Sequence, residues 1–142
     1  MLFTQSKKPK AELFEARDIA LCGSMLYIDQ IIQLADTLAE KGLTSYFPMP
    51  QEKEISRAEL GEEAFSKEKG NYIHTHLLKI EKSDKVLLAN YAKNGIEGYI
   101  GPNALIELAF GYALGKKLYL LFEPGEQNCK PEVLGLQPII LN

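Results

Sequence analysis

Short apolar runs that alternate with longer segments of helical periodicity constrain the fold most strongly. The apolar runs predict four strands and a short fifth one, over residues 18–22, 44–47, 85–89, 117–122 and 138–141. Helical spacing predicts helices over residues 27–41 and 102–114, and the charged stretch 51–69 a loop followed by a helix that continues to about Lys82. The alternation is typical of an α/β fold, a Rossmann-like or flavodoxin-like three-layer sandwich with a mostly parallel sheet of about four to five strands.

The length of 142 residues fits one domain, which we place at residues 17–142 after a polar leader at 1–16. No apolar run is long enough to span a bilayer, and residues 1–10 lack the apolar core of a secretion signal. We therefore expect a soluble protein of the cytoplasm that has no membrane partner.

The charge balance argues against a protein that coats nucleic acid. Sixteen basic and nineteen acidic side chains give a net charge of -3, whereas phosphate neutralisation needs a basic excess or a basic stripe.

The only two cysteines, Cys22 and Cys129, are too few for a disulfide scaffold or a zinc site. His74 and His76 are two residues apart on a helix, so they point in different directions. The sequence thus predicts no metal and no cofactor.

The predicted topology brings three loops together before any single residue is considered. Ligands of open α/β sheets bind beyond the carboxyl ends of the strands, where loops meet helix N-termini. Gly23 and Ser24, the segment after Phe47, and the loop over residues 91–101 all follow predicted strands. We expect them to line one crevice.

Glu107 is the most informative single residue. It is the only charged residue between Glu97 and Lys116, in a helix that is apolar almost all round and is therefore predicted to be buried on most sides. A buried carboxylate is costly unless it is paired or hydrated, and isolated buried ionisable groups cluster at functional sites. Small neighbours such as Asn103 leave room for a ligand above it. Pairing with Arg17, or a gap to solvent, is the structural alternative.

Other side chains of the predicted crevice have weaker signals. Gly23 and Ser24 at a helix N-terminus suit an anion, although a turn with a serine cap has the same sequence. Asp29 suits a sugar hydroxyl or simply the helix dipole. Tyr91 and Tyr99, beside the glycine-rich loop, suit stacking on a base or anchoring of that loop.

Three further residues have a structural alternative that we weigh beside a chemical one. His76 is a possible proton donor near neutral pH. Asp84 is expected to cap or end the preceding helix, as a structural acid. Cys22 is interpreted as a small buried strand residue, because the sequence pairs it with no histidine and acid that would activate a thiol.

The order of these motifs resembles the nucleoside 2-deoxyribosyltransferase-like superfamily, which includes the deoxynucleoside 5′-monophosphate N-glycosidases. The resemblance extends over about residues 18–122 and rests on four segments: Cys22-Gly23-Ser24, residues 83–88, residues 106–113 and Lys116-Lys117. The loop over residues 94–101 is similar to that of an uncharacterised subgroup.

The resemblance implies that Glu107 is a nucleophile that forms a covalent glycosyl intermediate with a deoxyribose, and that Gly23 and Ser24 lie near the sugar or its 5′-phosphate. The sequence departs from the family at two positions. His76 stands where the family usually has an aspartate that helps to protonate the departing base. Gly101 stands where transferases often have an aspartate. A small residue at this position is closer to the pattern of the monophosphate glycosidases.

The resemblance leaves three functions open and implies an oligomer. The first is cleavage or transfer at the N-glycosidic bond of a nucleoside or nucleotide, and the second is a non-catalytic module that senses nucleotides. The third is NAD glycohydrolase activity. Family members are usually dimers or larger, so a homodimer or higher homo-oligomer is expected.

Overall fold

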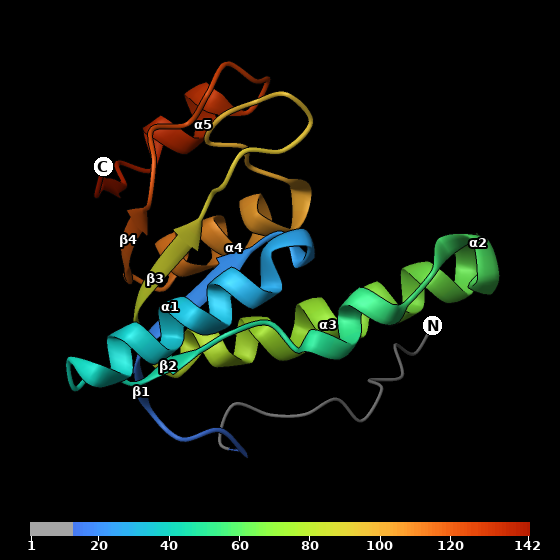
Figure 1. Cartoon of the computed structure of the whole chain (residues 1–142), viewed down its shortest axis with the longest axis horizontal. Coiled ribbons are helices and arrows are strands. Elements are labelled where there is room, and N and C mark those ends of the chain that lie inside the picture. The colour runs from blue at the N-terminus through green and yellow to red at the C-terminus, as the bar shows by residue number, and fades with distance from the viewer. Residues whose placement is uncertain (1–12) are drawn as a thin grey trace, which may run out of the picture.

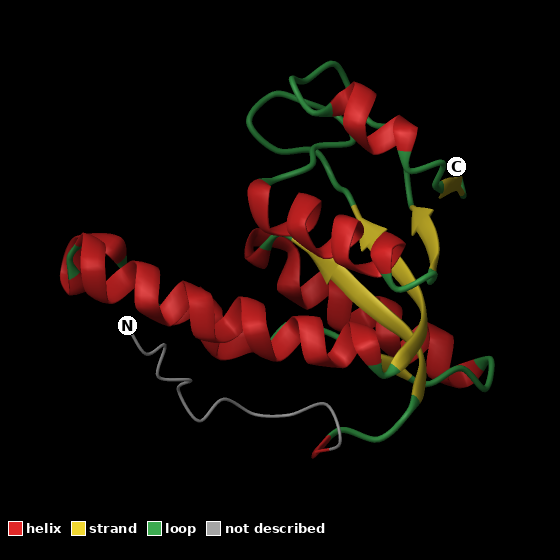
Figure 2. Ribbon diagram, turned by 180° about the vertical axis from the view of Figure 1, so that it is seen from behind, coloured by secondary structure: helices red, strands yellow, loops and turns green. Residues whose placement is uncertain are grey.

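The computed structural model describes residues 13–142 and contains one five-stranded parallel sheet in the order β2-β1-β3-β4-β5 (Figure 1). Its strands are β1 Arg17–Gly23, β2 Ser45–Tyr46, β3 Ser83–Ala89, β4 Lys117–Leu120 and β5 Ile139–Ile140. The predicted fold class is confirmed, since helices flank this sheet on both faces (Figure 2). The strand order changes direction between β1 and β3, so a crevice opens there at the carboxyl edge.

The three longer helices follow the predicted segments, and two short helices are additions. They are α1 Ile28–Glu40, α2 Arg57–Leu60, α3 Glu62–Glu81, α4 Pro102–Ala113 and α5 Lys130–Gly135, with 3-10 turns at η2 Met25–Tyr27 and η3 Pro50–Glu54. The sequence analysis did not predict α5, because six residues are too few to show helical periodicity. Its one fully buried side chain, Val133, packs with the core.

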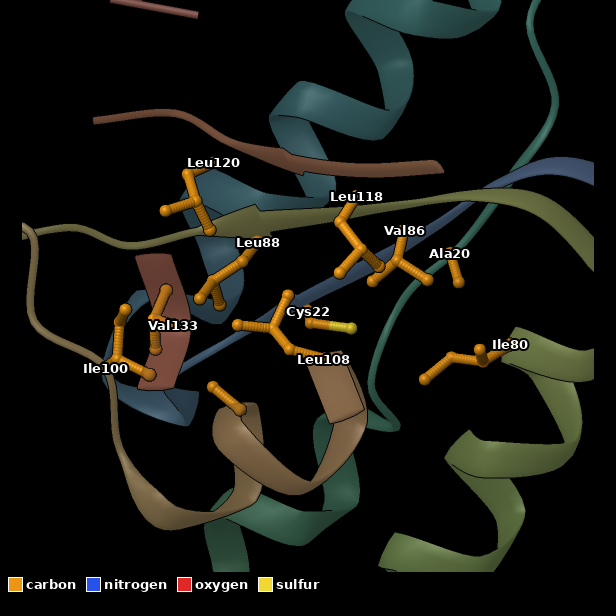
Figure 3. Close-up of a cluster of buried hydrophobic side chains, with 11 residues drawn as sticks. Ala20, Cys22, Ile80, Val86, Leu88, Ile100, Leu108, Leu118, Leu120 and Val133 are labelled. Carbon is orange, nitrogen blue, oxygen red and sulfur yellow. The ribbon is translucent and has the colours of Figure 1, made fainter. Parts of the chain in front are cut away.

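Two hydrophobic cores cover the two faces of the sheet. On one face α1 supplies Ile31 and Ala35 against Leu21 and Leu87. On the other face the larger core gathers side chains of the sheet, α3, α4, α5 and the loop before α4 (Figure 3): Ala20, Cys22, Ile80, Val86, Leu88, Ile100, Ala104, Leu108, Leu118, Leu120 and Val133. Burial on both faces explains why β1 and β3 are continuous apolar runs.

The helix α3 extends well beyond the sheet, with α2 at its far end (Figures 1 and 2). Its buried residues, His76, Lys79 and Ile80, all lie in its last two turns. The charged stretch 51–69 therefore forms η3, α2 and the first turns of α3, with a sharp turn at Gly61 (φ 82°). This arrangement brings a charged segment over the carboxyl edge of the sheet.

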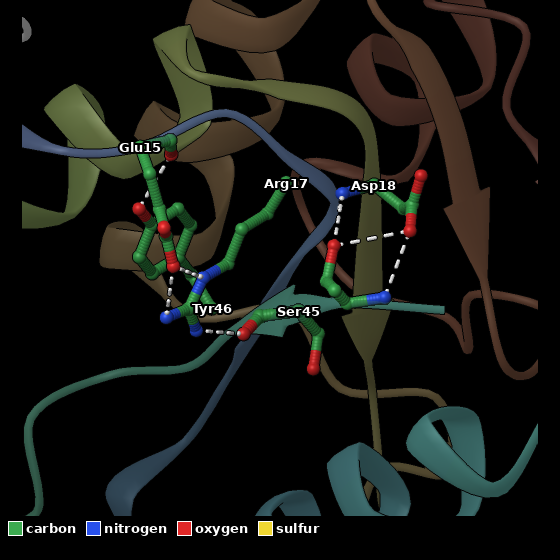
Figure 4. Close-up of polar contacts among 6 residues, drawn as sticks. Glu15, Arg17, Asp18, Ser45 and Tyr46 are labelled. Atoms are coloured by element: carbon green, nitrogen blue, oxygen red, sulfur yellow. Dashed lines mark hydrogen bonds and ion pairs between the residues drawn. The ribbon is translucent and has the colours of Figure 1, made fainter. Parts of the chain in front are cut away.

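The structural alternative, an ion pair of Glu107 with Arg17, is not found among the described residues. The Arg17 guanidinium instead donates to the Ser45 carbonyl over 2.7 Å and forms an ion pair with Glu15 over 3.0 Å (Figure 4). It also lies 4.2 Å above the ring of Tyr46. Residues 1–12 of the predicted leader lie outside the described residues, whereas Glu15 accepts a 2.6 Å hydrogen bond from the Tyr46 hydroxyl.

The prediction that α4 is buried on most sides is wrong. Its inner face holds Glu107 and Leu108, but Ile106 is 46% exposed and Tyr112 is 55% exposed. The sheet and α3 cover only one half of the helix, so its apolar outer half faces outward. Within residues 13–142, no helix has the length and apolar character needed to cross a bilayer.

Candidate functional site

The three segments predicted to share a crevice lie around one cavity of about 310 Å³ at the carboxyl edge of the sheet. Gly23 ends β1 and Ser24 follows it, Pro48 and Met49 follow β2, and the loop after β3 closes another side. The helices α3 and α4 complete the wall. The topology of the sheet therefore gathers residues that are far apart in the sequence.

Glu107 lies in the wall of this cavity and is only 7% exposed. Burial raises the pKa of its carboxyl to about 7, and the charge of Glu52 adds to this shift. A hydrogen bond with the Cys22 thiol and the charge of Lys69 act in the opposite direction. The carboxylate is thus poorly solvated and has one weak hydrogen-bond donor, which keeps it basic and reactive.

His76 and Cys22 lie beside this carboxyl. The Cys22 Sγ is 3.4 Å from Nε2 of His76, which lines the cavity and is 4% exposed. Burial, followed by the charge of Lys79, lowers the pKa of His76 to about 3, although contact with the Leu21 backbone opposes this shift. Burial also raises the pKa of the Cys22 thiol, and the charge of Glu107 raises it further.

Cys22 is the small buried strand residue that the sequence predicts, but the premise that it lacks a partnering histidine and acid is wrong. The two partners lie 54 and 85 residues further along the chain, on α3 and α4, and both helices pack on the same face of β1. Sequence spacing alone has no signal for such a contact. Within residues 13–142, one atom each of Cys22, His76 and Glu107 lie within 4.8 Å of one another, the only set with metal-ligand chemistry.

Ser24 and the loop after β3 form one side of the cavity. The Ser24 hydroxyl caps η2 by accepting from the Leu26 amide, and it lies 3.1 Å from the Lys93 ammonium. That ammonium is 5.9 Å from the centre of the Tyr99 ring. Tyr91 packs on Tyr27 with ring centres 4.9 Å apart. A cationic and hydroxylic corner thus lies beside two aromatic rings.

Two glycines of the predicted site have distinct roles. A Cβ on Gly23 would lie 2.8 Å from Cδ1 of Ile31 and 3.1 Å from the Ala89 carbonyl oxygen, so a side chain there would have to displace the buried Ile31 side chain. A Cβ on Gly101 would touch the Tyr99 ring at 3.4 Å, an ordinary contact. Gly101 is the N-cap residue of α4, and both it and Asn103 line the cavity.

A second loop holds the glycine-rich loop in place. The Gln127 side chain accepts from the Ile100 amide over 2.9 Å and donates to the carbonyls of Gly98 and Gly125, each over 3.0 Å. The buried Asn90 exchanges two hydrogen bonds with the Phe122 backbone. These bonds fix the backbone that presents Tyr91 and Tyr99 to the cavity.

Two predicted site residues do not line the cavity. Asp29 is exposed in the first turn of α1, where the helix dipole favours its charge. Asp84 is exposed near the amino end of β3, at the opposite edge of the sheet. The side chain that bonds to the end of α3 is Ser83, whose hydroxyl donates to the Lys79 carbonyl over 2.7 Å.

Four charged residues of the cavity wall were not predicted. Glu52 and Lys69 form an ion pair of 2.6 Å, and the Lys79 ammonium donates to the Phe47 carbonyl over 3.1 Å. Lys93 is the fourth. The first two lie in the charged stretch 51–69, which has the composition of a solvated surface. Only their place over the sheet edge identifies them.

Comparison with known proteins identifies no family for this chain. No model of a protein family matches the sequence, and no curated protein matches it either. The structure supports a fold class, a parallel α/β sheet of Rossmann-like type with its cavity at the carboxyl edge.

Proposed function

We propose that the protein cleaves or transfers the N-glycosidic bond of a nucleoside or nucleotide through a covalent intermediate on Glu107. The observation that carries this proposal is a desolvated carboxyl in the wall of a cavity large enough for a nucleotide's sugar and base. A carboxylate that water solvates poorly is well suited to attack an anomeric carbon with oxocarbenium character.

In the proposed reaction a Glu107 carboxylate oxygen bonds to C1′ of the sugar while the bond from C1′ to the base nitrogen breaks. The base leaves with that electron pair and takes up a proton from water. Water, or a second base, then attacks C1′ and displaces the carboxylate, so the configuration at C1′ is retained. Tyr91 and Tyr99 are the proposed stacking partners of the base.

The charges of the cavity favour a substrate with a phosphate. Lys69, Lys79 and Lys93 line it together with Glu52 and Glu107, which leaves a positive excess even when both carboxyls are ionised. Lys69 and Lys79 have protein partners, whereas Lys93 bonds to a neutral hydroxyl. We therefore propose that Lys93, with Ser24 and the Gly23 backbone, faces a 5′-phosphate.

His76 remains the proposed neighbour of the leaving base, in place of the family's aspartate. Because its pKa is about 3, the ring is neutral at physiological pH and offers a hydrogen bond, not a proton from an imidazolium. The same observation favours a second candidate function, a module of this fold that binds nucleotides without turnover. NAD cleavage has no separate support in the cavity.

A homodimer or larger homo-oligomer also stays a proposal. It is supported by the exposed apolar half of α4, which includes Ile106 and Tyr112, and by the long extension of α3 beyond the sheet. Sedimentation of the full chain tests it, and a monomer at all concentrations would contradict it.

A chromatographic assay for free base tests the proposed reaction. The protein is incubated with deoxynucleosides, deoxynucleoside 5′-monophosphates and NAD, with and without an acceptor base. We expect base release from a monophosphate that is lost in Glu107→Ala and Glu107→Gln. Thermal stabilisation by a nucleotide without any base release would favour the binding module. If the protein shows neither base release nor stabilisation, the proposed site is refuted.

A further inference from the structure

We propose that Cys22, His76 and Glu107 form a binding site for a thiophilic divalent cation, with zinc as the best match. The three side chains come from β1, α3 and α4, and one ligand atom of each lies within 4.8 Å of the others. Thiolate, imidazole and carboxylate are the three ligand types that zinc takes in proteins. The inference goes beyond the proposed function and does not depend on it.

The distance between the first two ligands already fits a bound ion. Zinc bonds of about 2.3 Å to sulfur and about 2.0 Å to nitrogen, at a tetrahedral angle, separate these atoms by about 3.5 Å. Cys22 Sγ and His76 Nε2 are 3.4 Å apart. The third ligand needs a shift on the order of 1 Å, within the reach of a Glu107 side-chain rotation.

The burial of these three side chains favours a bound ligand over ordinary packing among them. All three side chains are at least nine-tenths buried, and Nδ1 of His76 makes no hydrogen bond of normal geometry within residues 13–142. A buried ring nitrogen without such a bond is rare. The imidazole contacts the Leu21 backbone and the Cys22 thiol, and it leaves Nδ1 without a hydrogen bond of normal geometry.

The cavity gives the ion access and a fourth coordination position. His76 and Glu107 line the cavity, whereas Cys22 lies behind them at the base. An ion that enters from the cavity meets the carboxylate and imidazole first and keeps a water on the open side. Three protein ligands with one open position are the arrangement of catalytic zinc sites, not of closed structural ones.

The charges of this set balance when zinc is bound. The ion has two positive charges, and the Cys22 thiolate and the Glu107 carboxylate have one negative charge each. The thiol loses its proton to the solvent when the sulfur–zinc bond forms, and no oxidation takes place. Magnesium and calcium prefer oxygen ligands, so the same set is expected to reject them.

Zinc and a glycosyl group would both bond to the Glu107 carboxylate, so they exclude each other. Only this consequence rests on the proposed function: zinc would be a reversible inhibitor of base release, removed by a chelator. Zinc binding itself is measured without substrate, so failure of either proposal is distinguishable from failure of the other.

The test titrates the chelator-treated full chain with zinc chloride by calorimetry at pH 8, and with cobalt chloride by absorption. We expect one zinc per chain and a thiolate-to-cobalt charge-transfer band. Cys22→Ser and Glu107→Gln should weaken zinc binding at least about tenfold, and Cys22→Ser should abolish the band. Cys129→Ser, which changes the other cysteine, is the matched control and should keep both signals.

Circular dichroism and thermal unfolding check that each variant is folded. If Cys22→Ser does not fold, the zinc affinity of Glu107→Gln, measured by calorimetry, tests the proposal instead, because this change removes one charge and keeps the side-chain shape. The proposal is overturned if the wild type binds no zinc, if the folded variants bind it as tightly as the wild type, or if Cys129→Ser is the variant that loses the band.

Discussion

Replacing Glu107 with glutamine should make the protein more stable at alkaline pH. The folded-state pKa of about 7 lies above the value of 4.5 for an unhindered glutamate, because burial disfavours the charged form. Between these two values the folded state binds more protons than the unfolded state. The wild type therefore loses stability as the pH rises through this range.

The size of this effect follows from the pKa difference. A shift of one unit corresponds to about 1.4 kcal/mol, so the difference between 4.5 and about 7 corresponds to roughly 3 kcal/mol. Glutamine keeps the shape of the side chain and does not ionise. The free energy of unfolding of Glu107→Gln should therefore rise relative to that of the wild type by roughly 3 kcal/mol between pH 4.5 and pH 8.

Urea denaturation at a series of pH values, with a chelator present to exclude metal, measures this difference. Asp29→Asn is the matched control, since it makes the same carboxyl-to-amide change at an exposed residue. A Glu107→Gln difference that does not depend on pH would refute the reasoning, because it would mean that the carboxyl is not desolvated.

Three further predictions follow from the site and its supporting loop. In urea denaturation, Gly98→Ala should lower the free energy of unfolding by about 3 kcal/mol, since its φ is 65° and a Cβ would lie 2.0 Å from the Glu123 carbonyl oxygen. Gly95→Ala, at φ 73° in open space, should lower it by only about 1 kcal/mol. Equal losses in the two variants would contradict this reasoning. The pH–rate profile of kcat/KM should rise through about pH 7, because the proposed nucleophile must be ionised, and a fall over that range would exclude this role for Glu107. Lys93→Gln should raise the KM of a nucleoside 5′-monophosphate about tenfold and leave that of the nucleoside nearly unchanged; equal changes would remove the phosphate from its proposed place.

The sequence predicts the sheet well because its central strands are buried on both faces. A strand that is covered on both sides must be apolar where it is buried, and the apolar runs at 18–22 and 85–89 mark strands that the structure extends to 17–23 and 83–89. The position of the cavity follows from topology, since parallel strands place their carboxyl ends at one edge. Ser24, Tyr91 and Tyr99 could thus be assigned to it in advance.

The contacts inside the cavity could not be predicted in the same way. Periodicity shows that a helix has an apolar face, but not which residue of another element that face will meet. The approach of His76 to Cys22 depends on how α3 crosses β1, which no local pattern encodes. The outer half of α4 was predicted to be buried because exposed Ile106 and Tyr112 look like core residues in the sequence.

Mass spectrometry of the protein during turnover tests the central claim most directly. The reaction with a deoxynucleoside 5′-monophosphate is quenched in acid, and the intact chain and its peptides are weighed. If Glu107 is the nucleophile, the peptide that contains it gains the mass of one deoxyribosyl phosphate, and this gain is absent in Glu107→Gln. Base release by the wild type without any adduct, undiminished in Glu107→Gln, would contradict it.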